Sequence, residues 1–522
     1  MSGWSFAQVW DAIAASAPDR VAVICGETHR SFGELEDRAA RLAGHLAARG
    51  IGPDAKIAID LLNRVEYLEA FYAALKLGAV PVNVNYRYGV EETRYLLADA
   101  EAAAVITESS FAPVVRDAVP QLSVAPAVIE LGPDFDAAVA HPRLEATRTP
   151  DGDDLIFLYT GGTTGMPKGV MWRNDDLYVA LWQMGRPGTE PPDPLDALRA
   201  GKRPGTCLPA CPLMHGTGLF IALSTLAGGG TVVLLDGMGL DPVRIWDEVD
   251  RHEVAVLTIV GDAFARPLLD ELERDRSRWS LQSLRAITSS GVTWSPDVKR
   301  GLLDQLGRVT LLDSLGASEG LMSRSASRAD DAEIKPARFA VNDRVRVLSD
   351  DGREVEPGTD DVGMVGVGGR IPLGYYRDPE KTAKTFRTVN GVRYSIPGDY
   401  ATVDADGTIR LLGRGSATVN TGGEKVYPEE VELVLREHPA VDDCVVVGLP
   451  DPRFGEMVVA MVVARTAIGE SDLREHCRDR GLSGYKIPKR VVVIADMHRA
   501  PNGKADYTLL RSLAAEELGI TA

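Results

Sequence analysis

The sequence predicts an α/β fold: a large N-terminal domain of helix-covered α/β sheets with a small β-rich subdomain, followed by a small α+β C-terminal domain. Three features of the 522-residue chain predict it. Helix and strand patterns alternate through most of residues 1–340, Asp-Gly and Asn-Gly pairs separate short strands over about 340–412, and an α-β-β-α-β order follows. The predicted domains are 1–414 and 415–522, joined at the Gly/Ser-rich run GRGSATVNTGG.

The N-terminal pattern is typical of a mostly parallel sheet. Ser31 and Glu34 form the signature of a helix cap, and Gly50 ends the helix that they begin. A strand, a helix and two more strands are then expected over 56–62, 66–77, 79–83 and 102–107. A Pro- and Gly-rich stretch over 185–206 predicts a long surface loop. Beyond it, strands over 230–235 and 254–260 flank a helix with Asp241 as N-cap and Pro242 at its first position.

Turn signals mark the antiparallel region. The pairs Asp351-Gly352, Asn390-Gly391 and Asp406-Gly407 each stand between short alternating segments, as in tight hairpins. In the last unit, helices are expected over 428–438 and 471–480. Strands are expected over 444–448, 457–464 and 490–495.

Charge and cysteine content restrict the functional classes. Lys and Arg total 57 against 75 Asp and Glu, a formal charge of −18, so no basic surface for nucleic acid or an anionic membrane is expected. The first residues do not resemble a signal peptide, and the longest apolar run, Met457–Ala464, is too short to span a membrane. Five cysteines form no even disulfide framework, which favours a reducing, cytoplasmic location.

Two cysteines and a histidine that could bind a metal ion lie close together in the sequence. Cys207, Cys211 and His215 are spaced four residues apart. Pro209 and Pro212 break the helix that would align them, and no fourth ligand lies nearby in the sequence. We therefore favour packing over metal binding for these residues.

A glycine-rich loop follows the apolar strand Leu155–Tyr159 in LIFLYTGGTTGMPKGV. Glycines let backbone N–H groups approach an anion, threonine hydroxyls add donors, and Lys168 adds positive charge, so the composition indicates phosphate binding. The loop is not a Walker A motif, because Lys168 follows Pro167 and precedes Gly169 rather than Ser or Thr. A plain glycine turn is the alternative.

TGGTTGMPKG closely resembles the phosphate loop of the adenylate-forming superfamily, which includes acyl- and aryl-CoA synthetases, firefly-type luciferases and the adenylation domains of peptide synthetases. The remaining motifs of that superfamily follow in order over nearly the whole chain. They are PLMHGTG with His215, DSLGASEG over 313–320, the Gly-rich stretch 363–376, GDYATVDADGTIRLLGR with Asp399 and Arg414, and APNGK with Lys504.

The resemblance implies a role for each motif. Lys504, Glu319, Lys168 and His215 would be the catalytic residues, and Thr160 and Glu319 would help hold Mg²⁺ beside the ATP phosphates. Gly422 and Gly423 would line the CoA thiol tunnel. The residues assigned to ATP or AMP are Thr160, Gly161, Gly162, Thr163, Thr164, Gly165, Lys168, Asp313, Ser314, Leu315, Gly316, Ser318, Asp399, Arg414 and Lys504. The residues assigned to the acyl pocket are His215, Gly216, Gly261, Gly291, Gly316 and Ala317.

Four positions depart from the superfamily pattern. Leu315 stands where an aromatic residue often covers adenine, and Gly161 stands where Ser is frequent. Ser318 replaces Thr but keeps the hydroxyl, and Ser416 occupies a hinge position that is usually Asp or Lys. Stacking on adenine and a specific hinge side chain are therefore not expected here.

The resemblance implies an ATP-dependent acyl-CoA synthetase that works through an acyl-adenylate, with a mobile C-terminal domain that rotates about a hinge near 414–417. Together, GVMWR, IPGDY, LLGRGS and NTGGEKVYPEEVE look most like bacterial enzymes for medium- or long-chain fatty acids or steroid side-chain carboxylates. Small pocket residues favour a bulky acyl group, with close backbone packing as the alternative. Other functions left open are an acyl-AMP ligase that loads a carrier protein, an aryl-CoA ligase, a luciferase-like enzyme and a non-catalytic nucleotide-binding relative. The oligomeric state also stays open, a homodimer included.

Overall fold

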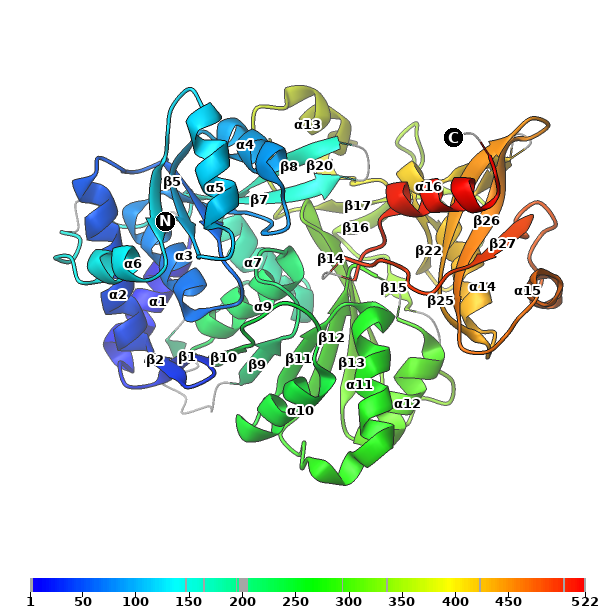
Figure 1. The fold of residues 1–522 in the computed structure, drawn as a ribbon, viewed down its shortest axis with the longest axis horizontal. Helices are drawn as coiled ribbons and strands as arrows, with labels where there is room; N and C mark the ends of the chain where they lie inside the picture. The colour runs from blue at the N-terminus through cyan, green and yellow to red at the C-terminus, as the bar shows by residue number, and fades with distance from the viewer. Residues whose placement is uncertain are drawn as a thin grey trace.

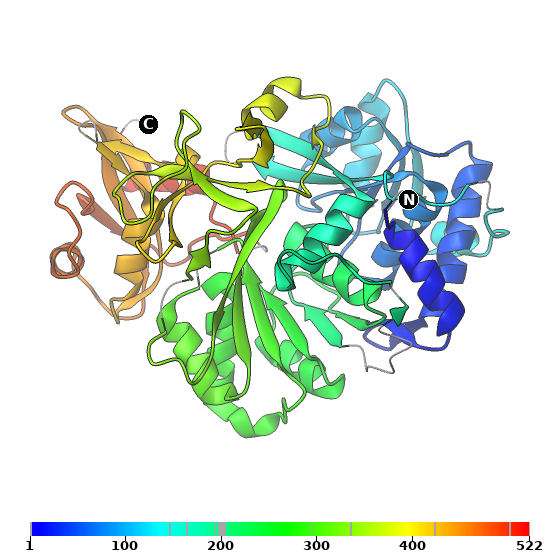
Figure 2. The same ribbon diagram turned by 180° about the vertical axis from the view of Figure 1, so that it is seen from behind.

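The computed structural model describes residues 3–520 apart from 146–147, 163–164, 194, 197–204, 293, 335–336, 422–423 and 501–502. The side chains of 161–165, 414 and 416 also lie outside the description. Figures 1 and 2 show a large body of helices and sheets and, at one side, a smaller unit formed by the C-terminal residues.

The first sheet has eight strands and is parallel except at its two edges. Its order is β14-β13-β12-β11-β9-β10-β1-β2, with antiparallel pairs at β13–β14 and β1–β2. The strands are β1 (Val21–Cys25), β2 (Thr28–Ser31), β9 (Thr206–Pro209), β10 (Thr231–Leu234), β11 (Val256–Ile259), β12 (Ala286–Ser290), β13 (Thr310–Ala317) and β14 (Gly320–Ser327).

The second sheet has seven strands in the order β18-β8-β7-β4-β3-β5-β6. It is parallel from β7 to β6 and antiparallel at β7–β8 and β8–β18. The strands are β3 (Lys56–Asp60), β4 (Val80–Asn83), β5 (Ala102–Thr107), β6 (Ala127–Glu130), β7 (Leu155–Gly162), β8 (Gly165–Arg173) and β18 (Gly374–Tyr375).

Helices cover both sheets, and one group contributes to an apolar core that the two sheets share. This group comprises α1 (Phe6–Ser16), α2 (Phe32–Ala48), α3 (Val65–Leu77), α6 (Pro133–Val139), α7 (Asn174–Gly185) and α9 (Gly216–Ala227). The outer face of the first sheet carries α10 (Pro242–Arg251), α11 (Gly261–Asp275) and α12 (Pro296–Leu306). The outer face of the second sheet carries α4 (Val90–Asp99) and α5 (Ala112–Ala118). Apolar faces buried on both sides explain why these strands are nearly all apolar.

The third sheet is antiparallel throughout. Its strands are β15 (Phe339–Ala340), β16 (Val345–Leu348), β17 (Gly363–Gly368), β19 (Phe386–Val389), β20 (Val392–Ser395), β21 (Asp399–Val403) and β22 (Thr408–Arg414), and α13 (Pro379–Thr385) precedes β19. Hairpins form at Asn390-Gly391 and at Asp406-Gly407, whereas Asp351-Gly352 lies within an isolated antiparallel bridge between Leu348 and Glu354. Asn390 and Gly391 have φ angles of 51° and 79° between β19 and β20, as a type I′ turn requires.

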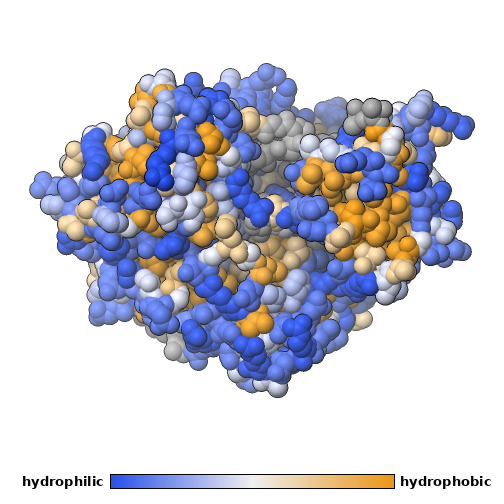
Figure 3. Space-filling view, viewed as in Figure 1, coloured by the Kyte–Doolittle hydropathy of each residue, from blue (hydrophilic) through white to orange (hydrophobic). Residues whose placement is uncertain are grey.

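The C-terminal unit has a sheet of its own and a separate apolar core. Its strands are β23 (Val419–Thr421), β24 (Glu424–Val426), β25 (Val441–Asp451), β26 (Gly455–Ala464) and β27 (Arg490–Val493), and its helices are α14 (Pro428–Arg436), α15 (Glu470–Asp479) and α16 (Tyr507–Glu517). Apolar side chains gather on the surface of the C-terminal unit near α16 (Figure 3). Leu509 on α16 is 40% exposed, and Val493 on β27 is 54% exposed.

The predicted α/β class is confirmed, and most element boundaries agree within a few residues. The pattern did not predict α16, β23 or β24. Asp506 caps α16 by accepting a hydrogen bond from Leu509 N at 3.0 Å. An aspartate at this position is an N-cap signal that can be read from the sequence. The placement of the domain boundary at 414–415 stays a prediction.

A buried ion pair supports β13, the strand that begins the motif at 313–320. Lys299 Nζ on α12 lies 2.6 Å from Asp313 Oδ2, and the two residues are 0% and 7% exposed. Burial raises the pKa of Asp313, while the Lys299 cation opposes that rise. Both charged groups are shielded from bulk water. If one partner is removed, water cannot replace it, and the other charge stays buried and uncompensated.

Lys299→Met is expected to destabilise the chain by about 3–5 kcal/mol, because the Asp313 carboxylate would stay buried without its cation. Urea unfolding followed by circular dichroism measures the loss. The double variant Lys299→Met/Asp313→Leu removes both charges and should recover most of it. Equal stability of the single and double variants would contradict the conclusion that Asp313 depends on the Lys299 cation for its buried charge.

Candidate functional site

The glycine-rich segment forms the tip of a hairpin. The strand β7 continues to Gly162, beyond the predicted end at Tyr159, and pairs with β8 so that Thr160 lies opposite Lys168 and Gly162 opposite Gly165. Thr163 and Thr164, at the turn, lie outside the described residues. The backbone at 160–162 and 165–168 therefore lies at one end of the second sheet, next to the turn, with an irregularity in register between Thr160 and Gly162.

Lys168 carries a positive charge beside this hairpin. Its Nζ lies 3.4 Å from Asp378 Oδ2 and 5.8 Å from the centre of the Tyr95 ring. A hydrogen bond with Tyr95 raises the pKa of Lys168, and the Asp378 carboxylate adds to the rise. The side chain is partly exposed, so it can exchange these partners for an anion.

Glu319 is tied to the hairpin through β8 and β18. The strand β18 pairs with β8, and the Tyr375 hydroxyl donates to Glu319 Oε1 at 2.6 Å. Trp172 Nε1 on β8 donates to the Ser318 carbonyl at 2.8 Å. The turn that carries Glu319 between β13 and β14 is therefore fixed next to the strand that carries Lys168.

The residues before Glu319 have structural contacts in this structure. Asp313 faces Lys299, as described above, and Ser314 Oγ lies 3.5 Å from Thr288 Oγ1. Leu315 is 8% exposed within the apolar core. A Cβ atom on Gly316 would lie 3.1 Å from the Gly320 carbonyl oxygen, so the β13–β14 bend favours glycine there, and Ala317 pairs with Gly320.

Asp399 and Arg414 come together through strand register. They are direct partners at the end of the antiparallel pair β21–β22. The side chain of Arg414 lies outside the described residues. The hinge predicted near 414–417 begins at this pair, where the structure has a short 3₁₀ helix over Gly415–Ala417.

Lys504 reaches the large domain near α11 and the loop after β12. A methyl group placed on Gly291 would lie 3.8 Å from Lys504 Cε, and one placed on Gly503 would lie 3.0 Å from Val260 Cγ1. Burial, together with the Lys504 cation, lowers the pKa of His215 to about 4. The structure therefore brings Lys504 close to Gly291 and His215, although it lies 213 and 289 residues after them in the chain.

Small residues surround this place. His215 is the N-cap of α9, and Gly216 is the first residue of that helix. Gly261 begins α11 with a φ angle of 53° and donates its N–H to Ser289 Oγ at 2.8 Å. Gly291 has a φ angle of 91°, which favours glycine. Gly422 and Gly423, predicted to contact CoA, lie outside the described residues between β23 and β24.

Asn83 is a functional candidate that the sequence reasoning missed. Its amide nitrogen donates to the carbonyls of Tyr159 at 2.9 Å and Met214 at 2.6 Å, and its Oδ1 accepts from Tyr159 N at 2.7 Å. The side chain is 7% exposed. It therefore holds the residue before Thr160 and the residue before His215 in one arrangement. VPVNVN is typical of the end of a strand and gives no signal of this role.

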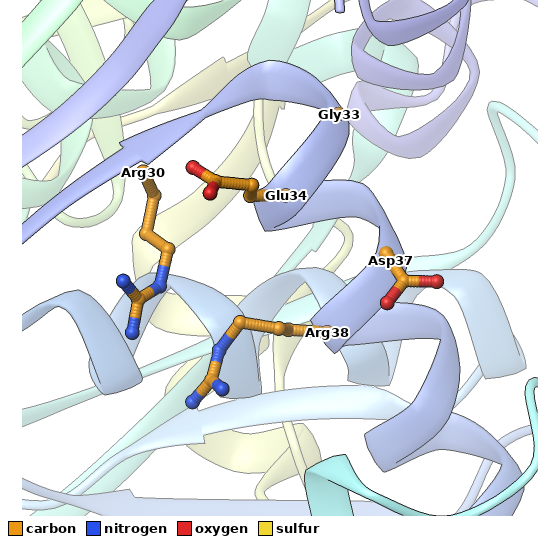
Figure 4. A pocket seen from close by; sticks show the side chains of 5 residues that line it. All are labelled: Arg30, Gly33, Glu34, Asp37 and Arg38. Atoms are coloured by element: carbon orange, nitrogen blue, oxygen red, sulfur yellow. The ribbon is translucent and has the colours of Figure 1, made fainter.

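A surface pocket of about 400 Å³ lies elsewhere, between β2 and α2. Figure 4 shows Arg30 and Arg38 pointing the same way from its wall, with Glu34 nearby. Both guanidinium groups pair with the buried carboxylate of Glu69, at 3.3 and 2.5 Å. Glu69 offsets one of these two positive charges, and the carboxylates of Glu34 and Asp37 also line the pocket, so it is a poorer anion site than the hairpin.

Comparison with known proteins places these features in a family. The model for AMP-binding enzymes matches residues 10–376, and the model for the AMP-binding enzyme C-terminal domain matches 430–504. The chain belongs to the family of AMP-binding enzymes. The predicted membership of the adenylate-forming superfamily is thereby confirmed.

Curated relatives match over most of the chain. A medium/long-chain-fatty-acid–CoA/3-oxocholest-4-en-26-oate–CoA ligase of Mycobacterium tuberculosis is 41% identical over 94% of this chain and 93% of its own. A 3-oxocholest-4-en-26-oate–CoA ligase of Rhodococcus rhodochrous is 38% identical over 94% and 92%.

Solved structures agree with the fold. ATP-bound MatB from Rhodopseudomonas palustris aligns with a TM-score of 0.83 and 28% identity over 99% of this chain and 100% of its own. The anthranilate CoA ligase AuaEII in complex with anthranoyl-AMP aligns with a TM-score of 0.86 over 100% and 99%, at 21% identity. Within the described residues, no helix is both long and apolar enough to cross a membrane.

Protonation of His215 is expected to oppose folding. Its pKa is about 4 in the folded chain against 6.5 for an ordinary histidine, so between these values the unfolded state binds more protons and stability falls as pH falls. His215→Gln removes this contribution. The Tm of the wild type relative to that of the variant should therefore decrease as pH is lowered from 7 to 4, measured by calorimetry at several pH values. A difference that does not change with pH would contradict the buried, neutral histidine.

Proposed function

We propose that this AMP-binding enzyme is an ATP-dependent acyl-CoA synthetase that joins medium- or long-chain fatty acids, or steroid side-chain carboxylates, to CoA through an acyl-adenylate. The observation that carries the proposal is the approach of Lys504 to His215 and Gly291. The names of the mycobacterial and rhodococcal relatives support the choice of acid and of CoA as acceptor.

The hairpin β7–β8 would bind the ATP phosphates. Backbone N–H groups of 160–165 and the Lys168 cation would face the β- and γ-phosphates, and Lys168 would leave Asp378 to do so. Asp399 and Arg414, paired in register, would bind the ribose. Ser314, Leu315, Gly316 and Ser318 would border the adenine ring and phosphates.

Mg²⁺ fits the donors at this site. Thr160 and Glu319 offer a hydroxyl and a carboxylate, which are hard oxygen ligands of the kind that Mg²⁺ prefers, and Tyr375 orients the carboxylate. Bound there, Mg²⁺ would neutralise charge on the ATP phosphates.

Lys504 would promote the first half-reaction. A carboxylate oxygen of the acid attacks the α-phosphorus of ATP and pyrophosphate leaves, so two anions must approach each other. The Lys504 ammonium would bridge the carboxylate and the α-phosphate and stabilise the charge in the transition state. Because the pKa of His215 is lowered to about 4, a neutral His215 would line the acyl site without attracting the carboxylate away from Lys504.

The second half-reaction needs a different arrangement. The CoA thiol attacks the acyl carbonyl, its proton is lost and AMP leaves with the anhydride electron pair. Rotation of the C-terminal unit about 414–417 would withdraw Lys504 and bring Gly422 and Gly423 to the thiol path. We place the enzyme in the cytoplasm, which is consistent with five free cysteines.

The acid and the acceptor are tested together. Pyrophosphate release is measured with ATP and Mg²⁺ across acetate, benzoates, C6–C18 fatty acids and 3-oxocholestenoate, with CoA or a free acyl carrier protein as acceptor. We expect release with fatty or steroid acids and a thioester with CoA. Preference for benzoates, thioester formation only on the carrier protein, or light emission would favour an aryl-CoA ligase, an acyl-AMP ligase or a luciferase-like enzyme instead. No release with any acid would overturn the proposal.

Lys504→Ala is expected to lower the adenylation rate by at least about a hundredfold, because charge at the α-phosphate would lose its positioned cation. Thioester formation from supplied acyl-AMP and CoA should stay near the wild-type rate. Single-turnover assays of the two half-reactions measure this contrast, and Lys425→Ala, a lysine near Tyr400, serves as a control. Equal loss in both half-reactions would contradict the role of Lys504.

A further inference from the structure

Two ion pairs join α11 of the large domain to the C-terminal unit. Arg266 Nε lies 3.8 Å from Asp442 Oδ1, and Arg436 Nη1 lies 4.0 Å from Asp262 Oδ2. Asp262 and Arg266 belong to the first two turns of α11, whereas Arg436 ends α14 and Asp442 lies on β25. Figures 1 and 2 show the C-terminal unit beside this part of the large domain.

The inner pair continues into the segment that carries Lys504. Arg436 Nη2 donates to the Cys444 carbonyl at 3.0 Å and lies 3.4 Å from Asp443 Oδ1. Arg499 forms a two-pronged pair with Asp443, at 2.6 and 2.8 Å, and its Nη1 donates to the Gly503 carbonyl at 3.0 Å. The residue after Gly503 is Lys504. One connected set of charges therefore extends from α11 to the residue before the lysine.

We propose that Asp262–Arg436 and Arg266–Asp442 form an electrostatic latch that stabilises the pose in which Lys504 lies at the acyl site. The strength of this latch sets the balance between the two half-reactions. This inference rests on the proposed function. Any rotation that carries the C-terminal unit away from α11 must separate both pairs, whereas the contacts within each domain can persist.

The two pairs differ in their access to water. The side chains of Arg436 and Asp262 are 6% and 13% exposed, and those of Arg266 and Asp442 are 14% and 42% exposed. Removal of one inner partner would leave a buried charge and risk misfolding. In the outer pair the Asp442 carboxylate is partly hydrated and open to screening by salt, so this is the pair whose charges we reverse.

Each outer partner also has a contact inside its own domain, which supplies matched controls. Arg266 Nη2 lies 3.1 Å from Asp297 on α12, and Arg465 Nε lies 3.2 Å from Asp442. Asp297→Asn and Arg465→Gln remove these internal partners and leave the pair between the domains in place. Both controls should behave like the wild type.

The test compares the two half-reaction rates at low salt. In Arg266→Glu, attraction to Asp442 becomes repulsion, so the ratio of thioester formation to adenylation should rise by about fivefold. The reversed pair Arg266→Glu/Asp442→Arg should return the ratio toward the wild-type value. Added salt should raise the ratio in the wild type and not in Arg266→Glu. An unchanged ratio in Arg266→Glu, or a reversed pair that fails to restore it, would overturn the latch.

A second measurement does not depend on activity. Spin labels at Glu273→Cys on α11 and Glu475→Cys on α15, in a Cys25→Ser background, report the distance between the domains; positions 273 and 475 are exposed and the four other native cysteines are buried. We expect one distance in the wild type, a second population in Arg266→Glu, and one distance again in the reversed pair. Identical distributions in all three would overturn the latch. A distance shift without any measurable half-reaction would instead overturn the proposed function and leave the latch standing.

Discussion

The side-chain amide of Asn83 is the interaction on which the site depends. Its hydrogen bonds to Tyr159 and Met214 connect β7 of the second sheet to the segment that follows β9 of the first sheet. Apolar contacts between the two sheets have little directional preference, so directional hydrogen bonds such as these, together with those of Asn63 to Cys211 and Leu213, set how the sheets lie over their shared core. A buried amide that donates both of its N–H groups and accepts one hydrogen bond fixes one arrangement. The hairpin that carries Thr160 and the helix that begins after His215 are therefore held at a constant separation.

Much of the fold could be predicted because its signals are local. The cap at Ser31 and Glu34 is present, with Ser31 accepting from Glu34 N, and Asp241 caps α10 as expected. The turn at Asn390-Gly391 also follows from two residues. The motif residues could be identified because the motifs follow one another in the same order as in a known superfamily. The role of each of these residues stays a prediction. The agreement reflects chemistry that is encoded within a few consecutive residues.

The contacts that hold the site together could not be predicted, because they join distant residues of ordinary type. Lys299 beneath Asp313, Tyr375 on Glu319 and Arg499 on Asp443 are identified only when the strands are in register. Gly374-Tyr375 was part of a noted motif, but its partner Glu319 lies 56 residues away. The strand β7 also continues past its predicted end, because β8 supplies a partner strand: Thr160 pairs with Lys168 and Gly162 with Gly165, with an irregularity in register between Thr160 and Gly162.

The pairing of Asp399 with Arg414 has a consequence for the route of the intermediate. Arg414 is the last residue of β22, and its backbone is fixed in the ladder with β21. A rotation that starts at Gly415 would turn everything beyond this pair and leave the pair where it is. The large domain would then keep the AMP part of the acyl-adenylate bound while the acyl carbonyl becomes accessible to the CoA thiol. The proposed pivot and the proposed ribose anchor are neighbours in the chain, so in the proposed mechanism a reactive anhydride would not have to be released into water between the two steps.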